Sequence, residues 1–345
     1  MICGFCWSCS SYLLSAIGYR SGSRQSFSLL PVACSLLPLF SCAGRPVQYT
    51  VVVPTIAEAI SLLGDTLWTL PLDQQSGPVR ARRIRLARDR ADKQPYDLGI
   101  ALDLARATAG MGRLRDAVGV LTDASGVHPT DPRIYQRRGE LLLWLRELDL
   151  AIADLQRAGR LTIGKPVLPG TAESPLGERS VTTLQYRTAF LLGGALYCQA
   201  RYSAAREAFT EALAWAITAD ERSEALLWLF FSVRRIDSGA EAPSVLDAVQ
   251  DRWAIGTRRR EIELLLAYKG RLPSDSIVVR ALAAANEDRA LYSYGLAYYL
   301  SLLPSRREEA ETWLEHARTA KSWTTLAYLA AEADLARLRG RMKVR

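Results

Sequence analysis

The residues of this 345-residue chain that could hold a metal ion are few and lie far apart. There are two histidines, His128 and His316, and six cysteines, five of which precede residue 43. A zinc site needs several His, Cys or carboxylate ligands at close and regular spacings. Cys198 and the two histidines are too widely separated to supply one, so the sequence predicts no metal site.

Three cysteines near the start form the pattern C-x2-C-x2-C at Cys3, Cys6 and Cys9. This pattern resembles part of an iron–sulfur ligand run, which needs a fourth cysteine at a defined spacing. No cysteine follows at that spacing. We therefore predict no iron–sulfur cluster.

Catalytic motifs are also missing from the sequence. There is no Gly-x-Ser-x-Gly elbow, no glycine-rich phosphate loop and no Cys/His pair at a workable spacing. Asp149 and Asp154 flank an apolar position on an expected helix, where carboxylates commonly serve solubility. We expect a protein that is not an enzyme, with no catalytic residue and no cofactor.

The first 42 residues differ from the rest because they contain no Asp or Glu. Arg20 and Arg24 precede an apolar stretch over 27–40, the order found in an export leader. The stretch ends in Leu39-Phe40-Ser41-Cys42, which resembles a bacterial lipobox with Cys42 as the lipidated residue, although Phe40 departs from the small residue usual at its position. We expect a leader over 1–42, a tether over 43–54 and a periplasmic protein anchored to the cell envelope. The alternatives are an ordinary cleaved signal and a cytoplasmic protein with a spurious upstream extension.

Small and apolar residues after the tether recur with a period of 34. The recurring pairs are Ala105 and Gly139, Ala117 and Ala151, Leu121 and Leu155, and Ala124 and Ala158. Small residues let two helices approach closely, and large residues fill the space between neighbouring helix pairs. Repeated helix pairs that cannot bury their apolar faces alone are typical of a solenoid.

Two further copies extend this pattern. The third contains Gly193, Ala205 and Phe209 after an insertion of 20 residues, and the fourth contains Gly295 and Leu314. The pattern resembles the tetratricopeptide repeat, and local sequence resembles a group of bacterial tetratricopeptide lipoproteins of unknown function. This resemblance implies an all-α fold, a helical-hairpin solenoid wound as a right-handed superhelix.

The repeats and the breaks between them predict the organisation of the chain. The first of the capping helices is expected from Thr55 to about Leu70, because Thr55-x-x-Glu58 reads as a capping box, and the second is the basic segment Arg80–Lys93. The expected segments are capping helices at 55–95, two repeat units at 96–160, a loop insertion at 161–180, a third unit with degenerate repeats at 181–288, and a last unit with a capping helix at 289–345.

The resemblance also implies a binding surface. In tetratricopeptide proteins the first helix of each repeat lines a concave groove that holds a peptide. The positions carried over by register are Arg106, Arg133, Gln136, Glu140, Trp144, Arg187, Tyr197, Arg289 and Tyr292. Arginine pairs with carboxylates through a two-pronged contact, so we expect a groove for an extended peptide, an acidic one included. The other interpretation is that Trp144 and Tyr197 only pack between helices.

Two functions remain open at this point. The first is an envelope-tethered scaffold whose partner is an unknown protein or peptide. The second is a cytoplasmic adaptor whose basic helix Arg80–Lys93 contacts nucleic acid, since the net charge is +8. That helix lacks interleaved aromatic residues, which makes nucleic acid the weaker expectation. The sequence predicts neither the partner nor the oligomeric state.

Overall fold

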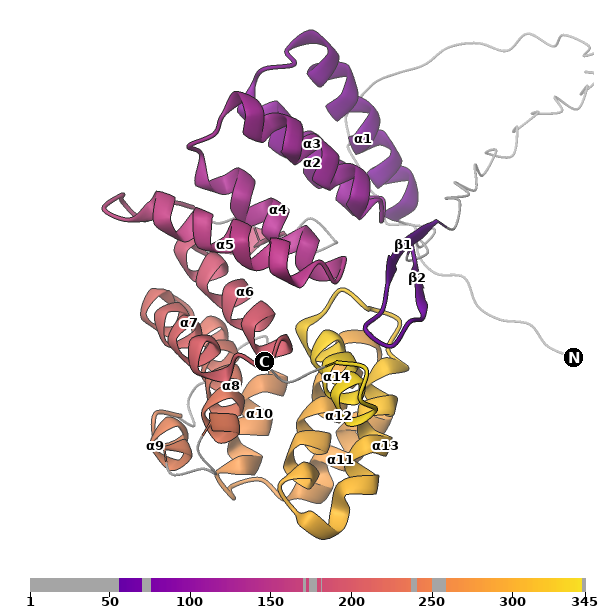
Figure 1. Ribbon diagram of the computed structural model, residues 1–345, viewed down its shortest axis with the longest axis vertical. Helices are drawn as coiled ribbons and strands as arrows, with labels where there is room; N and C mark the ends of the chain where they lie inside the picture. Colours follow the sequence, from indigo (N-terminus) through magenta and orange to yellow (C-terminus); the bar gives the residue numbers. More distant parts are fainter. Residues whose placement is uncertain are drawn as a thin grey trace, which may run out of the picture. The chain divides into compact units, whose positions relative to one another are not determined.

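The structure is a computed structural model, and it describes residues 56–69, 76–169, 172–173, 179–180, 182–236, 241–249 and 259–342. The expected leader, Cys42 and the tether at 43–54 lie outside these residues. All described residues belong to one compact unit that runs from Tyr49 to Arg345. Its fold is an all-α helical solenoid with short β-hairpins added, which confirms the predicted fold class (Figure 1).

Three helical hairpins carry the 34-residue pattern, and hairpins that are consecutive in the sequence pack against each other (Figure 1). They are α2 (Leu98–Gly110) with α3 (Leu114–Val127), α4 (Pro132–Trp144) with α5 (Leu148–Thr162), and α6 (Leu184–Cys198) with α7 (Tyr202–Trp215). The first helix of each hairpin starts at a side chain that caps its free N–H groups, namely Asp97, Asp131 and Thr183. Local sequence thus sets where these hairpins begin.

A left-handed residue joins the two helices of every one of these hairpins. The residues are Gly112, with φ 80°, Arg146, with φ 67°, and Ala200, with φ 60°. Glycine adopts this conformation freely, whereas a residue with a Cβ is strained by about 1 kcal/mol or more. Arg146 and Ala200 therefore occupy turn positions that suit glycine.

The glycines of the repeats lie where two helices meet. A Cβ on Gly139 would come within 2.8 Å of Leu155, and one on Gly193 within 2.7 Å of Phe209. These contacts confirm the predicted small-residue seams and place Leu155 inside its own hairpin. Gly295 differs, because the atoms nearest to a Cβ added there belong to Leu264 of α10 (Arg259–Tyr268), at 2.6 Å. At this position the fourth copy is therefore packed unlike the second and third.

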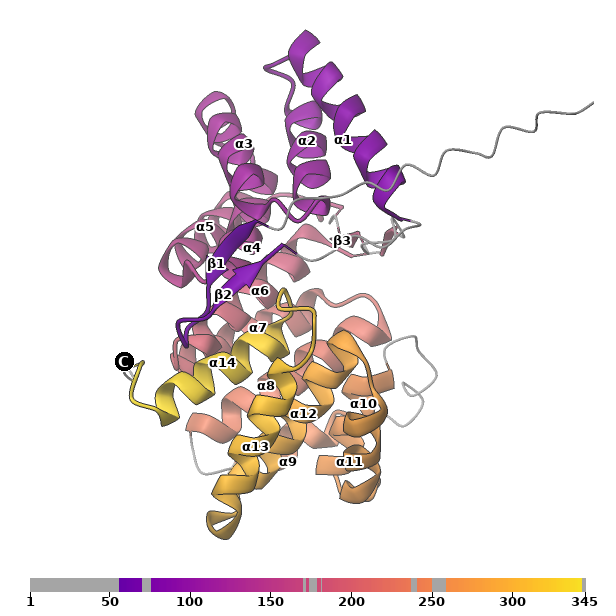
Figure 2. The same ribbon diagram turned by 90° about the vertical axis from the view of Figure 1, so that its right-hand side faces the viewer.

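The C-terminal half is a helical cluster in which packing is no longer only sequential. Helix α10 contacts α8 and α12, and α14 contacts α6 and α12 as well as α13 (Figures 1 and 2). The other elements of this half are α8 (Ala219–Ile236), α9 (Ala242–Asp247), α11 (Ser274–Ala283), α12 (Asn286–Ser301), a 3₁₀ turn (Pro304–Arg306), α13 (Arg307–Arg318) and α14 (Leu326–Leu338).

The prediction of a helix from Thr55 to Leu70 is wrong. This segment forms the antiparallel strands β1 (Ala57–Ile60) and β2 (Thr66–Trp68), joined by a turn with Gly64 at φ 94°. The glutamate of the presumed capping box, Glu58, caps a different helix: its carboxylate accepts hydrogen bonds from the backbone N–H groups of Leu114 and Arg115 at the start of α3. The second expected helix is confirmed as α1 (Ser76–Lys93).

The β1–β2 hairpin bridges the first repeat and the C-terminal segment. Beyond its contact with α3, Trp323 Nε1 donates to the carbonyl of Trp68 at 2.8 Å, and Arg318 pairs with Asp65. These contacts join residues more than 250 positions apart in the sequence. The hairpin therefore acts as a clasp between the two ends of the helical array.

The insertion at 161–180 lies at the start of α6. It carries the two-residue strands β3 (Ala172–Glu173) and β4 (Arg179–Ser180), which pair with each other. Leu184 N donates to the carbonyl of Leu168. The side-chain amide of Gln185 accepts a hydrogen bond from Leu168 N and donates one to the carbonyl of Pro166. The predicted break between the second and third repeats is thus present.

Candidate functional site

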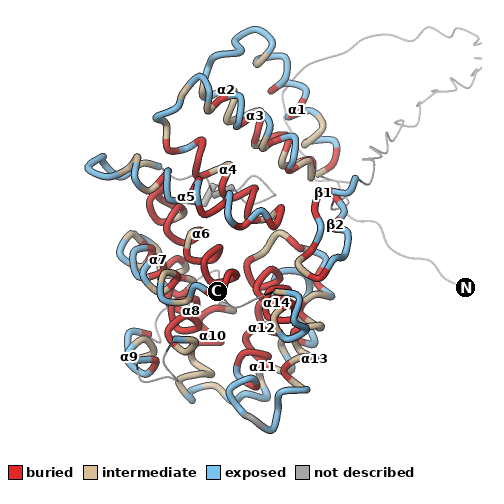
Figure 3. The backbone as a smooth tube through the Cα atoms, viewed as in Figure 1, coloured by how far each residue is buried: buried red, intermediate tan, exposed pale blue. Residues whose placement is uncertain are grey.

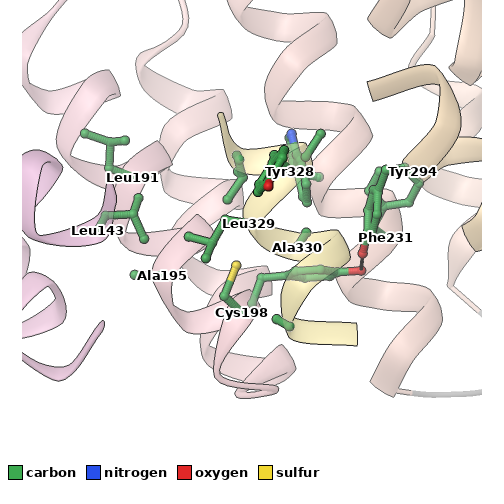
Figure 4. Packing of buried hydrophobic residues seen from close by; sticks show 14 of the residues in the cluster. Leu143, Leu191, Ala195, Cys198, Phe231, Tyr294, Tyr328, Leu329 and Ala330 are labelled. Atoms are coloured by element: carbon green, nitrogen blue, oxygen red, sulfur yellow. Dashed lines mark hydrogen bonds between the residues drawn. The ribbon is translucent and has the colours of Figure 1, made fainter. Parts of the chain in front are cut away.

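Helix α14 occupies the inner side of the array, where the groove was expected. Eleven of its residues, from Leu326 to Ala336, are buried, so it is covered on all sides (Figure 3). A Cβ on Gly194 of α6 would come within 2.8 Å of Leu326. Figure 4 shows Leu329 on the side of Cys198 and Leu143, with Ala330 toward Tyr294. Beside α6, the space expected to hold a partner peptide is therefore filled by α14 of the same chain.

Tyr197 was predicted to contact a partner, and the structure places it in the core instead. Its side chain is fully buried, and its hydroxyl lies 2.6 Å from that of Tyr294 on α12. Its ring packs edge-on against Trp228 of α8 at 5.4 Å between centroids. Because α12 and α14 close over α6, this position cannot reach a partner in the observed structure.

A buried ion pair between Arg146 and Glu332 links α14 to the turn between α4 and α5. The guanidinium donates from Nε and Nη2 to the two carboxylate oxygens, at 3.0 and 2.9 Å. Arg146 Nη1 donates to the carbonyls of Trp144 and Trp323, so the cation has partners on all sides. The side chains are 3% and 0% exposed. The arginine at this turn position thus links the second hairpin to α14.

A second buried carboxylate, Asp334, lies two residues after Glu332 on α14. Arg235 of α8 donates to it at 2.6 Å, Arg337 pairs with its other oxygen, and the Tyr294 hydroxyl donates at 3.1 Å. Burial alone would raise the pKa of Asp334, but the two arginines outweigh burial and lower it. Asp334 therefore stays ionised and ties α14 to α8 and α12.

Glu140 is the centre of the polar cluster that remains on the inner side of α4 and α6. Arg187 Nη2 and Arg137 Nη1 donate to its two oxygens at 2.7 and 2.8 Å, and Gln136 approaches it at 3.4 Å. Burial would raise the pKa of Glu140, yet the two arginines lower it to about 2. Glu140 is thus an internal counter-ion for arginines and not an exposed ligand contact.

The depressed pKa of Glu140 predicts an acid-sensitive contribution to stability. The unfolded carboxyl titrates near 4.5 and the folded one near 2, so the contribution is complete above pH 4.5 and is lost as the pH falls toward 2. At about 1.4 kcal/mol per pKa unit, it amounts to about 3 kcal/mol. Urea unfolding between pH 6 and 2.5 should therefore show a steeper loss of stability for the parent than for Glu140→Gln. Parallel pH profiles would contradict the assignment.

The remaining predicted groove residues have different surroundings. Arg133 is exposed and pairs with Asp131, and Arg106 is partly exposed beside Asp103. Trp144 is partly buried at the end of α4. On α12, Arg289 donates to the Ala284 carbonyl, and the buried Tyr292 donates to Glu263 at 2.5 Å. Three partly exposed arginines, Arg106, Arg133 and Arg187, therefore remain on α2, α4 and α6, while Tyr292 faces its own chain.

Sequence reasoning missed the residues that fill the inner side. The last helix was expected only as a capping helix, yet its carboxylates Glu332 and Asp334 are buried. A signal was present in the sequence: Tyr328-Leu329-Ala330-Ala331 and Ala333, Leu335 and Ala336 make α14 apolar all round, which is typical of a central helix. Such a helix can keep acidic residues only where the fold supplies cations.

The potential metal ligands and nucleophiles of the described residues are dispersed. Nowhere in that part of the chain do three His, Cys, Asp or Glu side chains gather as a metal site. Burial raises the pKa of the Cys198 thiol to about 12, so the thiolate that would react is not formed. His128 donates to the carbonyl of Tyr96, and His316 Nδ1 lies 2.8 Å from Ser293 Oγ. Among the described helices, none combines the length and apolar character needed to cross a bilayer.

Comparisons with known proteins add a remote structural likeness. No family model and no curated protein matches the chain. The solved structure of MamA is similar to 59% of this chain over 99% of its own length, with 14% sequence identity and a TM-score of 0.38. The assignment of the fold therefore rests on the hairpins, turns and glycine seams described above.

Proposed function

We propose that this chain is a scaffold that binds another protein or an extended peptide, and that it performs no reaction of its own. Repeat solenoids offer extended surfaces that suit such binding. The surface in question is formed by α2, α4 and α6, carries partly exposed arginines, and is called the upper face here. The carrying observation is that Arg106, Arg133 and Arg187 project from the first helices of three successive hairpins and retain 23, 46 and 20% side-chain exposure.

Each of these arginines already faces a carboxylate of its own chain, so a partner must offer acidic groups that join or replace them. The exposed Arg133 pairs with the partly buried Asp131, and such a surface pair contributes about 0–1 kcal/mol. Arg187 shares Glu140 with Arg137, so it can add a second carboxylate without abandoning the first. Trp144 supplies an apolar surface at the end of α4. An extended acidic peptide matches this combination.

The test is capture of partners by the full-length chain, followed by titration of the purified partner. The double variant Arg133→Ala/Arg187→Ala is expected to weaken binding by about tenfold or more, because two charge-assisted hydrogen bonds are lost. The control variant Arg222→Ala/Arg307→Ala removes two exposed arginines from α8 and α13. Equal affinity of the parent and the first variant would refute the upper face as the binding site.

We also propose that the scaffold is held to the cell envelope through lipid on Cys42. Support for this comes only from the leader-like composition of residues 1–42 and from the Leu39–Cys42 pattern. Mass spectrometry of the N-terminal peptide tests it: a diacylglyceryl group on Cys42 is expected. An intact N-terminus would instead favour the cytoplasmic adaptor.

A further inference from the structure

Helix α1 has one face that belongs to the fold and another that does not. Ile84 and Ala87 are buried against Ala107 and Met111, and Arg80 donates to the Gly110 carbonyl at the end of α2. These contacts hold α1 at the end of the helical array (Figure 1). The opposite side of α1 is exposed along its length (Figure 3).

That opposite side carries a stripe of apolar and basic residues, which we call the outer stripe. Its members follow the spacing of one helix face at i, i+3, i+7, i+11 and i+14. They are Val79, Arg82, Leu86, Arg90 and Lys93. Val79 is 65% exposed and Leu86 44% exposed, although large apolar side chains on a helix normally turn to the core.

The outer stripe is strongly cationic. Helix α1 contains seven Arg and Lys residues against two acidic residues, Asp89 and Asp92. Within the part of the chain that the structure describes, Arg82, Arg90 and Lys93 have no ion-pair partner, whereas the arginines of the upper face each have one. The charge of the outer stripe is therefore available to an external anion.

We propose that the outer stripe docks on an anionic phospholipid surface. Arginine and lysine side chains would pair with the headgroup phosphates, while Val79 and Leu86, which lie between them on the same face, would enter the boundary with the acyl chains. The two apolar residues favour lipid over nucleic acid, because a phosphate backbone offers them nothing to bury against. No aromatic residue of α1 is available to stack on bases.

The outer stripe and the diacylglyceryl group proposed on Cys42 would act on the same membrane. The lipid would anchor the chain, and the outer stripe would hold α1 against the anionic surface. The docking of the outer stripe does not require this lipid, so the two attachments can be tested separately.

The experiment is vesicle flotation of the full-length chain carrying Cys42→Ser, which removes the acylation site. Vesicles of phosphatidylcholine with and without phosphatidylglycerol are compared at low and high salt. We expect binding that depends on phosphatidylglycerol and weakens with salt. The variant Arg82→Glu/Arg90→Glu/Lys93→Glu should reduce it on the order of 100-fold.

Two further variants separate the alternatives. Arg201→Glu/Arg222→Glu/Lys321→Glu changes the net charge equally at exposed positions outside α1, and it should bind almost as the parent does. Val79→Ser/Leu86→Ser keeps the charge and should weaken vesicle binding severalfold. Binding without dependence on phosphatidylglycerol, equal losses in both charge variants, or an unchanged Val79→Ser/Leu86→Ser variant would overturn the proposal. So would tighter binding to a DNA or RNA duplex than to the vesicles.

Discussion

Arg146→Ala and Glu332→Ala are each expected to lower the free energy of unfolding by about 3–5 kcal/mol. Either change leaves a charge buried without its partner, since the two side chains are 3% and 0% exposed. For Arg146→Ala the loss of four hydrogen bonds adds to this effect. Urea unfolding followed by circular dichroism measures the change directly.

A double variant and a surface variant make this prediction specific. Arg146→Met/Glu332→Leu removes both charges and keeps apolar volume, so it should destabilise less than the sum of the single alanine variants. Arg339→Ala breaks exposed ion pairs with Glu311 and Glu315 and should change stability by about 1 kcal/mol or less. If Arg146→Ala behaved like Arg339→Ala, the pair would not be the link between α14 and the second hairpin.

Trp228→Ala is expected to destabilise the protein by about 3–5 kcal/mol. Its indole lies 5.4 Å from Tyr197, 5.4 Å from Phe231 and 5.6 Å from Tyr294, measured between ring centroids. It therefore joins α6, α8 and α12, which are not consecutive helices. Removing it leaves a cavity where the packing departs from that of a linear array of repeats.

An exposed tryptophan provides the comparison. Trp68 is 50% exposed, and only its backbone carbonyl accepts the bond from Trp323. Trp68→Ala should change the free energy of unfolding by about 1 kcal/mol or less. Thermal unfolding of both variants in one buffer measures the difference. Equal losses of stability would contradict a central role of Trp228 in the packing of α6, α8 and α12.

The β1–β2 hairpin and the Arg146–Glu332 ion pair are expected to make unfolding more cooperative than in a linear repeat array. In a linear repeat array each unit contacts only its neighbours, and stability is close to a sum of local terms. Here Glu58 and Glu332 connect elements that are distant in the sequence. We therefore regard the described residues as one cooperative array closed by its own C-terminal helix.

The sequence by itself determined the hairpins. The 34-residue period, the caps at Asp97, Asp131 and Thr183, and the glycines at 139 and 193 are local or nearly local signals, because each acts within one helix or between two consecutive helices. The same reasoning gave the basic helix α1 and the absence of catalytic motifs. The prediction was wrong at Thr55–Leu70, where a capping-box pattern stands before a strand.

Only the tertiary structure decided what the inner side of the array holds. Family register placed Tyr197 and Tyr292 at a groove, but helices α12 and α14 return to cover Tyr197, and Glu263 takes the Tyr292 hydroxyl. The sequence does not show which arginines surround the acidic residues of α14, so it does not predict that these residues are buried. Burying a carboxylate is favourable only when cations converge on it from several elements, and Arg146 and Arg235 reach Glu332 and Asp334 from α4–α5 and α8 only in the folded chain. Long-range pairing of this kind is a property of the assembled packing and not of any local pattern.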